Sequence, residues 1–193
     1  MTSFDDTALI DDMDSLYPDG TPPEVITAVL RSSLDELDRL RTARNNFFVL
    51  GSYDEPEKQR LDALCRVLSV PEGDEPFTLE EIDPGVDVWE NFYVKFRVFL
   101  LRTDHVVAVF ESNDGGHELE IGEVDLDRVH VLKRDYESVS VDHDLEYAKY
   151  DAMLGTLFDL LDRRDRLHEW ETKREFYAAA AELSATVGNG HPP

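Results

Sequence analysis

Two uninterrupted apolar runs constrain the fold of this chain more than any other feature. The first is Phe47–Leu50, which Gly51 ends, and the second is Val106–Phe110 within "HVVAVFE". A strand whose residues are all apolar is buried on both faces, and such strands are typical of a parallel sheet. Because helical patterns precede and separate the two runs, we expect βαβ units.

The predicted fold class is α/β, with a mostly parallel sheet of about five strands flanked by helices on both faces. Weaker strand patterns cover residues 76–82, 128–135 and 137–141. Helical spacing follows Pro56 through Leu68 and continues from Val88 to Leu100. An N-terminal helix and a long C-terminal helical region complete the prediction.

We expect five segments along the chain. The long fourth segment contains no helix breaker and has an apolar stripe through Leu167 and Trp170, which suggests two helices, or one that packs on a second subunit. The segments are a flexible acidic arm (1–20), an N-terminal helix opened by Thr21 and Pro22 (21–45), an α/β core (46–143), a C-terminal helical region (144–186) and a frayed tail (187–193).

The charge of the chain excludes several kinds of partner. Its 43 Asp and Glu outnumber its 19 Lys and Arg, for a formal net charge of −24. A solvated acidic coat of this kind suits work at high ionic strength, where the Debye length falls to roughly 3 Å near 1 M salt. Binding to a nucleic-acid polymer or an anionic membrane needs clustered Lys and Arg, and the sequence has no basic stripe. We therefore expect a halophilic protein with neither partner.

Cofactor and metal chemistry have little support in the sequence. The single cysteine, Cys65, cannot form an internal disulfide or a thiolate metal cluster, and His117 has no His or Cys at metal-ligand spacing. No phosphate-binding loop of the nucleotide-triphosphatase type and no nucleophile elbow is present. The acidic N-terminus lacks the basic region of a secretory signal. We expect no metal, no cofactor and a cytoplasmic location.

Ligands of parallel sheets bind beyond the carboxyl ends of the strands, so the loops after the two apolar runs are the candidate site. These loops are Gly51–Tyr53 and Ser112–Glu120. The second loop has two interpretations. In one, Asn113 to Gly116 form the tip of a β-hairpin, and the chain is a structural assembly protein without a pocket. In the other, the chain turns from strand to helix.

The helical interpretation of this loop is favoured. Strand alternation through Leu119 and Ile121 fails at Gly122, whereas Leu119, Gly122, Glu123 and Leu126 are spaced as one face of a helix. A carboxylate in the first turn, at Glu120, would be stabilised by the partial positive charge of the helix N-terminus.

Three stretches in this order, "NNFFVLGSY", "RTDHVVAVFE" and "NDGGHELEIGE", resemble the nucleoside 2-deoxyribosyltransferase-like superfamily and its nucleotide-binding relatives near the TIR domains. The resemblance covers roughly residues 45–141. Ser52-Tyr53 departs from the Gly-Pro pair that is frequent in that family, and His117-Glu118 replaces small residues. The matching positions are Gly51, Asp104, Asp114, Gly115 and the trio Glu120-Ile121-Gly122.

The resemblance implies a nucleoside or nucleotide ligand and cleavage or transfer of its N-glycosidic bond, a hydrolase or transferase activity. In that chemistry Glu120 is the catalytic nucleophile, and Asp114 assists departure of the base. Tyr53 would stack on the ligand and Ser52 would form a hydrogen bond. The implied substrate-binding residues are Gly51, Ser52, Tyr53, Asp104, Gly115, Gly116 and Gly122.

Alternatives remain open at this point. Glu120 is also compatible with a solvated surface position, and Asp104 with a structural one. A non-catalytic nucleotide-sensing or protein-interaction module of the same fold is the second hypothesis. The apolar surplus of the terminal helices predicts a homodimer.

Overall fold

A computed structural model describes residues 34–82, 92–111, 124–135 and 152–188 of the chain. In this part of the chain no helix is long and apolar enough to cross a membrane. The helices are α3 (Leu34–Thr42), α4 (Glu57–Leu68), α5 (Leu79–Ile82), α6 (Phe92–Leu101), α9 (Ala152–Asp162) and α10 (Lys173–Gly188), and the strands are β1 (Asn45–Leu50), β2 (Asp74–Thr78), β3 (His105–Phe110), β4 (Val129–Arg134) and β5 (Leu167–Trp170).

The five strands form one sheet in the order β2-β1-β3-β4-β5, and every neighbouring pair is parallel. Phe48 of β1 lies opposite Val106 of β3, and Val107 of β3 lies opposite His130 of β4. The predicted α/β class and the two strongest predicted strands are confirmed. The weaker pattern at 76–82 is a strand only as far as Thr78, after which α5 begins.

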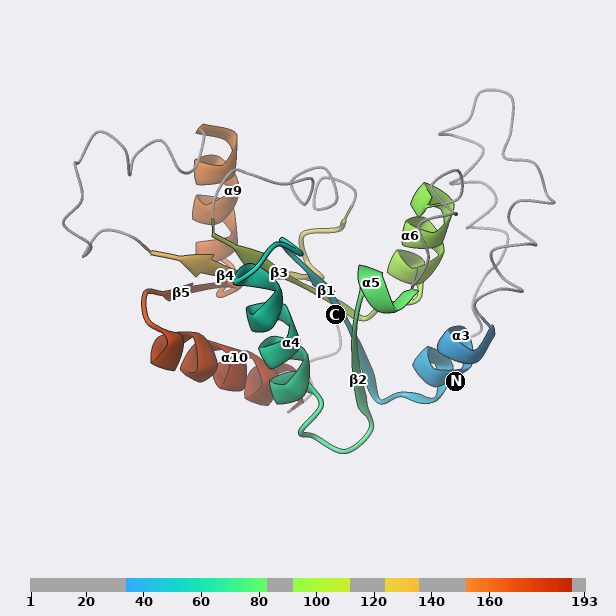
Figure 1. The fold of residues 1–193 in the computed structure, drawn as a ribbon. Helices are drawn as coiled ribbons and strands as arrows, with labels where there is room; N and C mark the ends of the chain where they lie inside the picture. The colour runs from blue at the N-terminus through green and yellow to red at the C-terminus, as the bar shows by residue number, and fades with distance from the viewer. Residues whose placement is uncertain (1–33, 83–91, 112–123, 136–151, 189–193) are drawn as a thin grey trace, which may run out of the picture.

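Helices cover both faces of the sheet, as expected from the fully apolar strands (Figure 1). In β1, Phe48 and Leu50 pack into a core with side chains of α3, α5, α6 and α9. Phe47 and Val49 point to the opposite face and pack with α4 and α10. Alternate residues of each central strand therefore serve two different cores, which is why β1 and β3 are buried at every position after the first.

The C-terminal region differs from its prediction. Residues 144–186 were expected to be helical throughout, but β5 separates α9 from α10 and joins the same sheet beside β4. Leu167 and Trp170 therefore belong to a strand and not to a helical stripe. The helical prediction is wrong here because these four residues, LHEW, are compatible with both the helix period of about 3.6 residues and the strand period of about 2.

The turn that ends α9 explains why no breaker marked this boundary. Asp165 adopts a positive φ of 55°. Its N–H donates to the carbonyl of Asp162 at 3.0 Å, and the N–H of Arg166 donates to the carbonyl of Leu161 at 3.0 Å. These two bonds form a Schellman motif, whose left-handed position is usually glycine. Here an aspartate occupies it.

Helix α10 begins with a capping box and packs on the sheet of its own chain. Thr172 Oγ1 accepts the N–H of Glu175 at 3.3 Å, and Glu175 Oε2 accepts the N–H of Thr172 at 3.0 Å. Phe176 and Leu183 are buried in the core that α10 shares with α4. The apolar residues that suggested a homodimer are thus used within the chain, and the homodimer stays a prediction.

Several predicted segments lie wholly or partly outside the described residues. They include the arm at 1–20 and the strand at 137–141. Of the N-terminal helix expected at 21–45, the structure describes α3, which ends at Thr42, whereas Asn45 already belongs to β1. At the other end, α10 continues to Gly188, two residues beyond the predicted boundary at 186.

Aromatic rings from four strands form a ladder across the sheet face that α4 and α10 cover. Phe47 stacks on His105 with ring centroids 5.4 Å apart, and the pairs His105–His130 and His130–His168 are each 6.0 Å apart. The three histidines stand at or near the first residues of β3, β4 and β5. The ladder therefore runs along the amino-terminal part of the sheet.

The ladder histidines are held in their neutral form. Burial, together with the nearby Arg166, lowers the pKa of His130 to about 3. Arg166 Nη1 lies 3.2 Å from His130 Nε2. Because a guanidinium can only donate hydrogen bonds, Nε2 of His130 must be the unprotonated ring nitrogen that accepts. Burial also lowers the pKa of His105 and of His168, although Asp104 and Glu182 respectively oppose these shifts.

The ladder should make stability depend on pH. Above the ordinary histidine pKa of 6.5, the ladder does not lower the free energy of unfolding, because its histidines are neutral in both the folded and the unfolded chain. Below it, the unfolded chain takes up protons that the folded ladder cannot bind until the pH nears its lowered pKa. His130 alone should reduce the free energy of unfolding by roughly 2 kcal/mol between about pH 7.5 and about pH 5. Urea unfolding at constant salt measures this, and His130→Gln should flatten the dependence; an unchanged slope in that variant would contradict the account.

Candidate functional site

The strand order reverses between β1 and β3, and this defines the candidate site. The chain leaves β1 toward β2 on one side and leaves β3 toward β4 on the other. In open parallel sheets, ligands bind where two such connections diverge, at the carboxyl ends of the strands. Gly51–Tyr53 follow β1 at this edge and Glu111 follows β3.

Gly51 allows α4 to lie close to the carboxyl end of β1. A Cβ atom at this position would lie 2.8 Å from Cδ2 of Leu61, in α4, and 3.2 Å from the carbonyl oxygen of Val109, in β3. Leu61 is 1% exposed, so its side chain has little room to move. The small residue predicted after the first strand is therefore required by the packing of β1, β3 and α4.

Ser52 and Tyr53 are both tied to neighbouring backbone. Ser52 Oγ accepts the N–H of Asp54 at 3.2 Å, as in a Ser turn. The Tyr53 hydroxyl accepts the N–H of Leu79, at the start of α5, at 2.8 Å. The Tyr53 ring packs partly buried against both hydrophobic cores, and Lys58 Nζ lies 5.9 Å from its centroid. Tyr53 thus links the loop after β1 to the end of β2.

Asp104 is not brought together with Gly51–Tyr53. It directly precedes β3, and its Oδ2 accepts the N–H of Asn46, near the start of β1, at 2.9 Å. The carboxyl edge lies the length of a six-residue strand away, which is roughly 20 Å. The hydrogen bond joins the amino ends of two neighbouring strands, a structural contact.

The predicted catalytic pair, Glu120 and Asp114, lies outside the described residues, as do Gly115, Gly116 and Gly122. The residues on which the hairpin interpretation rests, 113–116, also lie outside the described residues, so both interpretations of this loop stay predictions. Over Val106–Ala108, β3 pairs with β1 on one edge and with β4 on the other, both parallel. Both edges of β3 are therefore occupied by parallel neighbours over these three residues.

A charged cluster that sequence reasoning missed lies at the same carboxyl edge. Glu111 is 7% exposed and accepts hydrogen bonds from Arg60 Nε, in α4, and from Arg134 Nη1, at the end of β4, the latter at 3.3 Å. The guanidinium carbons of Arg60 and Arg134 lie 5.8 and 5.3 Å from the ring centroid of Trp170, at the end of β5. These contacts join α4 to the ends of β3, β4 and β5.

The sequence contains a signal for two of the four residues of this cluster. Glu111 and Arg134 are charged residues at the carboxyl ends of apolar strands, a position where functional side chains gather in α/β folds. Arg60 had no such signal, because it is one of several charged residues in α4. For Trp170 the sequence pattern predicts a helix, whereas the residue ends β5.

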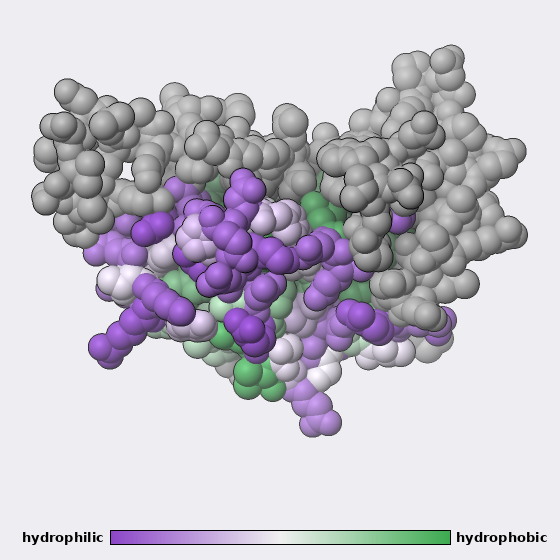
Figure 2. Space-filling view, in the orientation of Figure 1, coloured by the Kyte–Doolittle hydropathy of each residue, from purple (hydrophilic) through white to green (hydrophobic). Residues whose placement is uncertain are grey.

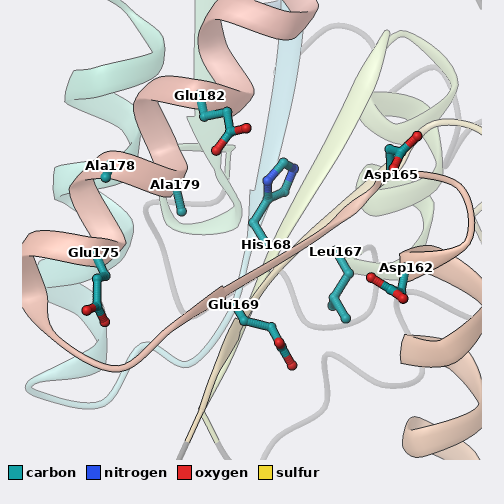
Figure 3. Close-up of a pocket in the computed structure, with 9 residues that line it drawn as sticks. All are labelled: Asp162, Asp165, Leu167, His168, Glu169, Glu175, Ala178, Ala179 and Glu182. Carbon is teal, nitrogen blue, oxygen red and sulfur yellow. The ribbon is translucent and has the colours of Figure 1, made fainter.

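A separate cavity of about 420 Å³ lies beside the edge strand β5 and is lined by five carboxylates and His168. Figure 3 shows Glu175 and Glu182 of α10 on one side of it, and Asp162 and Asp165 on the other. No group of three or more His, Cys, Asp or Glu in the described part of the chain is arranged to hold a metal ion. The five carboxylates give the cavity beside β5 a negative charge, which makes it unsuited to an anionic ligand.

Two glycine substitutions test the packing at the site. Gly51→Ala should lower the free energy of unfolding by about 1–3 kcal/mol, because the new methyl overlaps Leu61 and presses on Val109. Gly155→Ala, in α9, is the matched control, since a Cβ there meets nothing within 4 Å. It should raise stability by about 0.5–1 kcal/mol through helix propensity. Denaturant titration measures both; a Gly51→Ala protein as stable as the parent would refute the close approach of α4.

Comparison with known proteins gives one match. No curated protein and no solved structure matches the chain. The model of one protein family matches residues 20–151, about two thirds of the chain, which include β1 to β4 and precede α9, β5 and α10. The chain therefore belongs to DUF8170, a family of unknown function.

Proposed function

We propose that this chain binds a nucleoside or nucleotide at the carboxyl edge of the sheet, in the region between the ends of β1 and β3. The observation that carries the proposal is the strand order β2-β1-β3-β4-β5, which makes the connections after β1 and β3 diverge at that edge. This order is the flavodoxin-like form of the doubly wound fold, in which ligands bind at the point of divergence.

The second part of the proposal is cleavage or transfer of the N-glycosidic bond through Glu120. The resemblance to nucleoside 2-deoxyribosyltransferases supports it, and so does the chain path, because Asp114 and Glu120 belong to the connection that begins at the carboxyl edge with Glu111. In this reaction a Glu120 oxygen bonds to the sugar C1′ as the bond from C1′ to the base nitrogen breaks. Asp114 supplies the proton of the departing base. Water then releases the sugar in a hydrolase, and a second base receives it in a transferase.

The acidic surface supports a working environment of high ionic strength. Hydrophilic residues cover much of the described surface on the α4 and α10 face (Figure 2), in a chain of formal charge −24. At molar salt this charge is screened within roughly 3 Å, so an anionic ligand would be attracted only by cations in direct contact with it. Ligand binding is therefore best measured at molar KCl.

Binding is tested by a thermal-shift panel of nucleosides, mononucleotides and dinucleotides at molar KCl. A ligand at about 100 times its Kd stabilises the folded chain by about 2.7 kcal/mol, which corresponds to a shift in Tm of roughly 5–10 °C for a chain of this length. We expect members of one ligand class to produce such a shift. If no nucleoside or nucleotide changes Tm, the proposed function fails.

Catalysis is tested by release of free base from the ligands that bind. Glu120→Gln should reduce release by at least about 100-fold, because an amide cannot act as the nucleophile. Its thermal shift with ligand should remain. Glu118→Gln is the matched control, with the same change of charge two residues away, and should keep the parent rate. Binding without base release in the parent protein would instead identify a nucleotide-sensing module of the same fold.

A further inference from the structure

The Arg60, Glu111, Arg134 and Trp170 cluster fixes two guanidinium groups before any ligand arrives. Glu111 is buried and accepts one N–H from each arginine, of the five that each guanidinium carries. Both guanidinium groups also lie over the ring of Trp170. Because a carboxylate and an aromatic ring restrain each group, little side-chain freedom is left to lose when a ligand binds.

Two arginines meet at the buried carboxylate of Glu111. Arg60 and Arg134 are brought to the same carboxylate in a chain where acids outnumber bases 43 to 19. Glu57 lies 3.4 Å from Arg60 Nη2, but it is one turn away on the same helix, and such pairs are weak. A ligand anion can therefore displace Glu57 at small cost.

Exposure and position relate the cluster to the proposed binding region. The side chains of Arg60 and Arg134 are 19% and 33% exposed, whereas Glu111 is 7% exposed, so the cations and not the carboxylate have the larger accessible surface. Glu111 follows β3, the strand beside β1, and Arg60 is in α4, the helix that follows Gly51–Tyr53. The cluster thus adjoins the region between β1 and β3 on its β4 side.

We propose that Arg60 and Arg134 together bind the phosphate of the ligand, so that the ligand class is a nucleoside phosphate and not a free nucleoside. This inference rests on the proposed function and deepens it. A phosphate presents several oxygens to the planar, forked donors of arginine and forms short, charge-assisted hydrogen bonds with them. Such contacts operate at direct range and therefore survive molar salt.

The test compares each of the common nucleoside 5′-monophosphates with its own nucleoside, by thermal shift and calorimetry at molar KCl. The readout is the ratio of the two affinities. We expect the best monophosphate to bind roughly ten- to hundredfold more tightly than its nucleoside. In Arg60→Gln and in Arg134→Gln this ratio should fall about tenfold or more, while affinity for the nucleoside changes little. Arg164→Gln is the control, because it removes the same charge from an exposed ion pair with Asp127 and should leave the ratio unchanged.

A second measurement avoids dependence on variants that fold poorly. Inorganic phosphate, titrated into parent protein with ¹⁵N-labelled arginine, should move the Nε–H resonances of Arg60 and Arg134, which Arg60→Lys and Arg134→Lys assign. Arg164 should not respond.

The possible outcomes separate the two proposals. If nucleosides and monophosphates bind the parent equally, the proposed function stands and the phosphate site is overturned. If no nucleoside or nucleotide binds but phosphate moves both arginine resonances, the anion site stands and the nucleotide function fails. If phosphate moves neither resonance and the variants keep the parent ratio, the arginines only join α4 to the sheet, and the inference is wrong.

Discussion

The parallel pairing of β1 with β3 is the constraint on which the rest of the structure depends. Each strand is buried on both faces, and β3 has parallel neighbours on both edges. Parallel neighbours cannot be joined by tight turns, so each connection must cross a face of the sheet, and helices there bury the apolar side chains. Because the connections after β1 and β3 diverge, the same pairing also creates the candidate ligand region. Fold and site thus have one cause.

Sequence reasoning recovered the elements whose patterns have a single interpretation. The runs ending at Leu50 and Phe110 are too uniformly apolar for a half-exposed strand or an amphipathic helix, and both are strands. The four residues of β5 fit either period, and the turn before them uses Asp165 where a glycine would have marked the helix end. A usable signal for this region did exist: Thr172 and Glu175 have the spacing of a capping box, which indicates a new helix start.

The candidate site was predictable only where its residues act locally. Gly51 follows from the end of an apolar strand, and the structure gives its reason in the contact between β1 and α4. Asp104 sits beside a strand too, but at the amino end, where it bonds to Asn46. The cluster around Glu111 needs side chains from α4, β4 and β5, and their proximity follows from strand order and helix placement. No sequence spacing indicates such a contact.

The proposed function places the ligand at the carboxyl edge of the sheet, between β1 and β3. The most direct measurement is a crystal structure of the complex, grown at molar salt with a tightly binding nucleotide. We expect ligand density against Gly51 and Tyr53, with the phosphate between Arg60 and Arg134. Density in the acidic cavity beside β5, or along the histidine ladder at the amino-terminal part of the sheet, would contradict it.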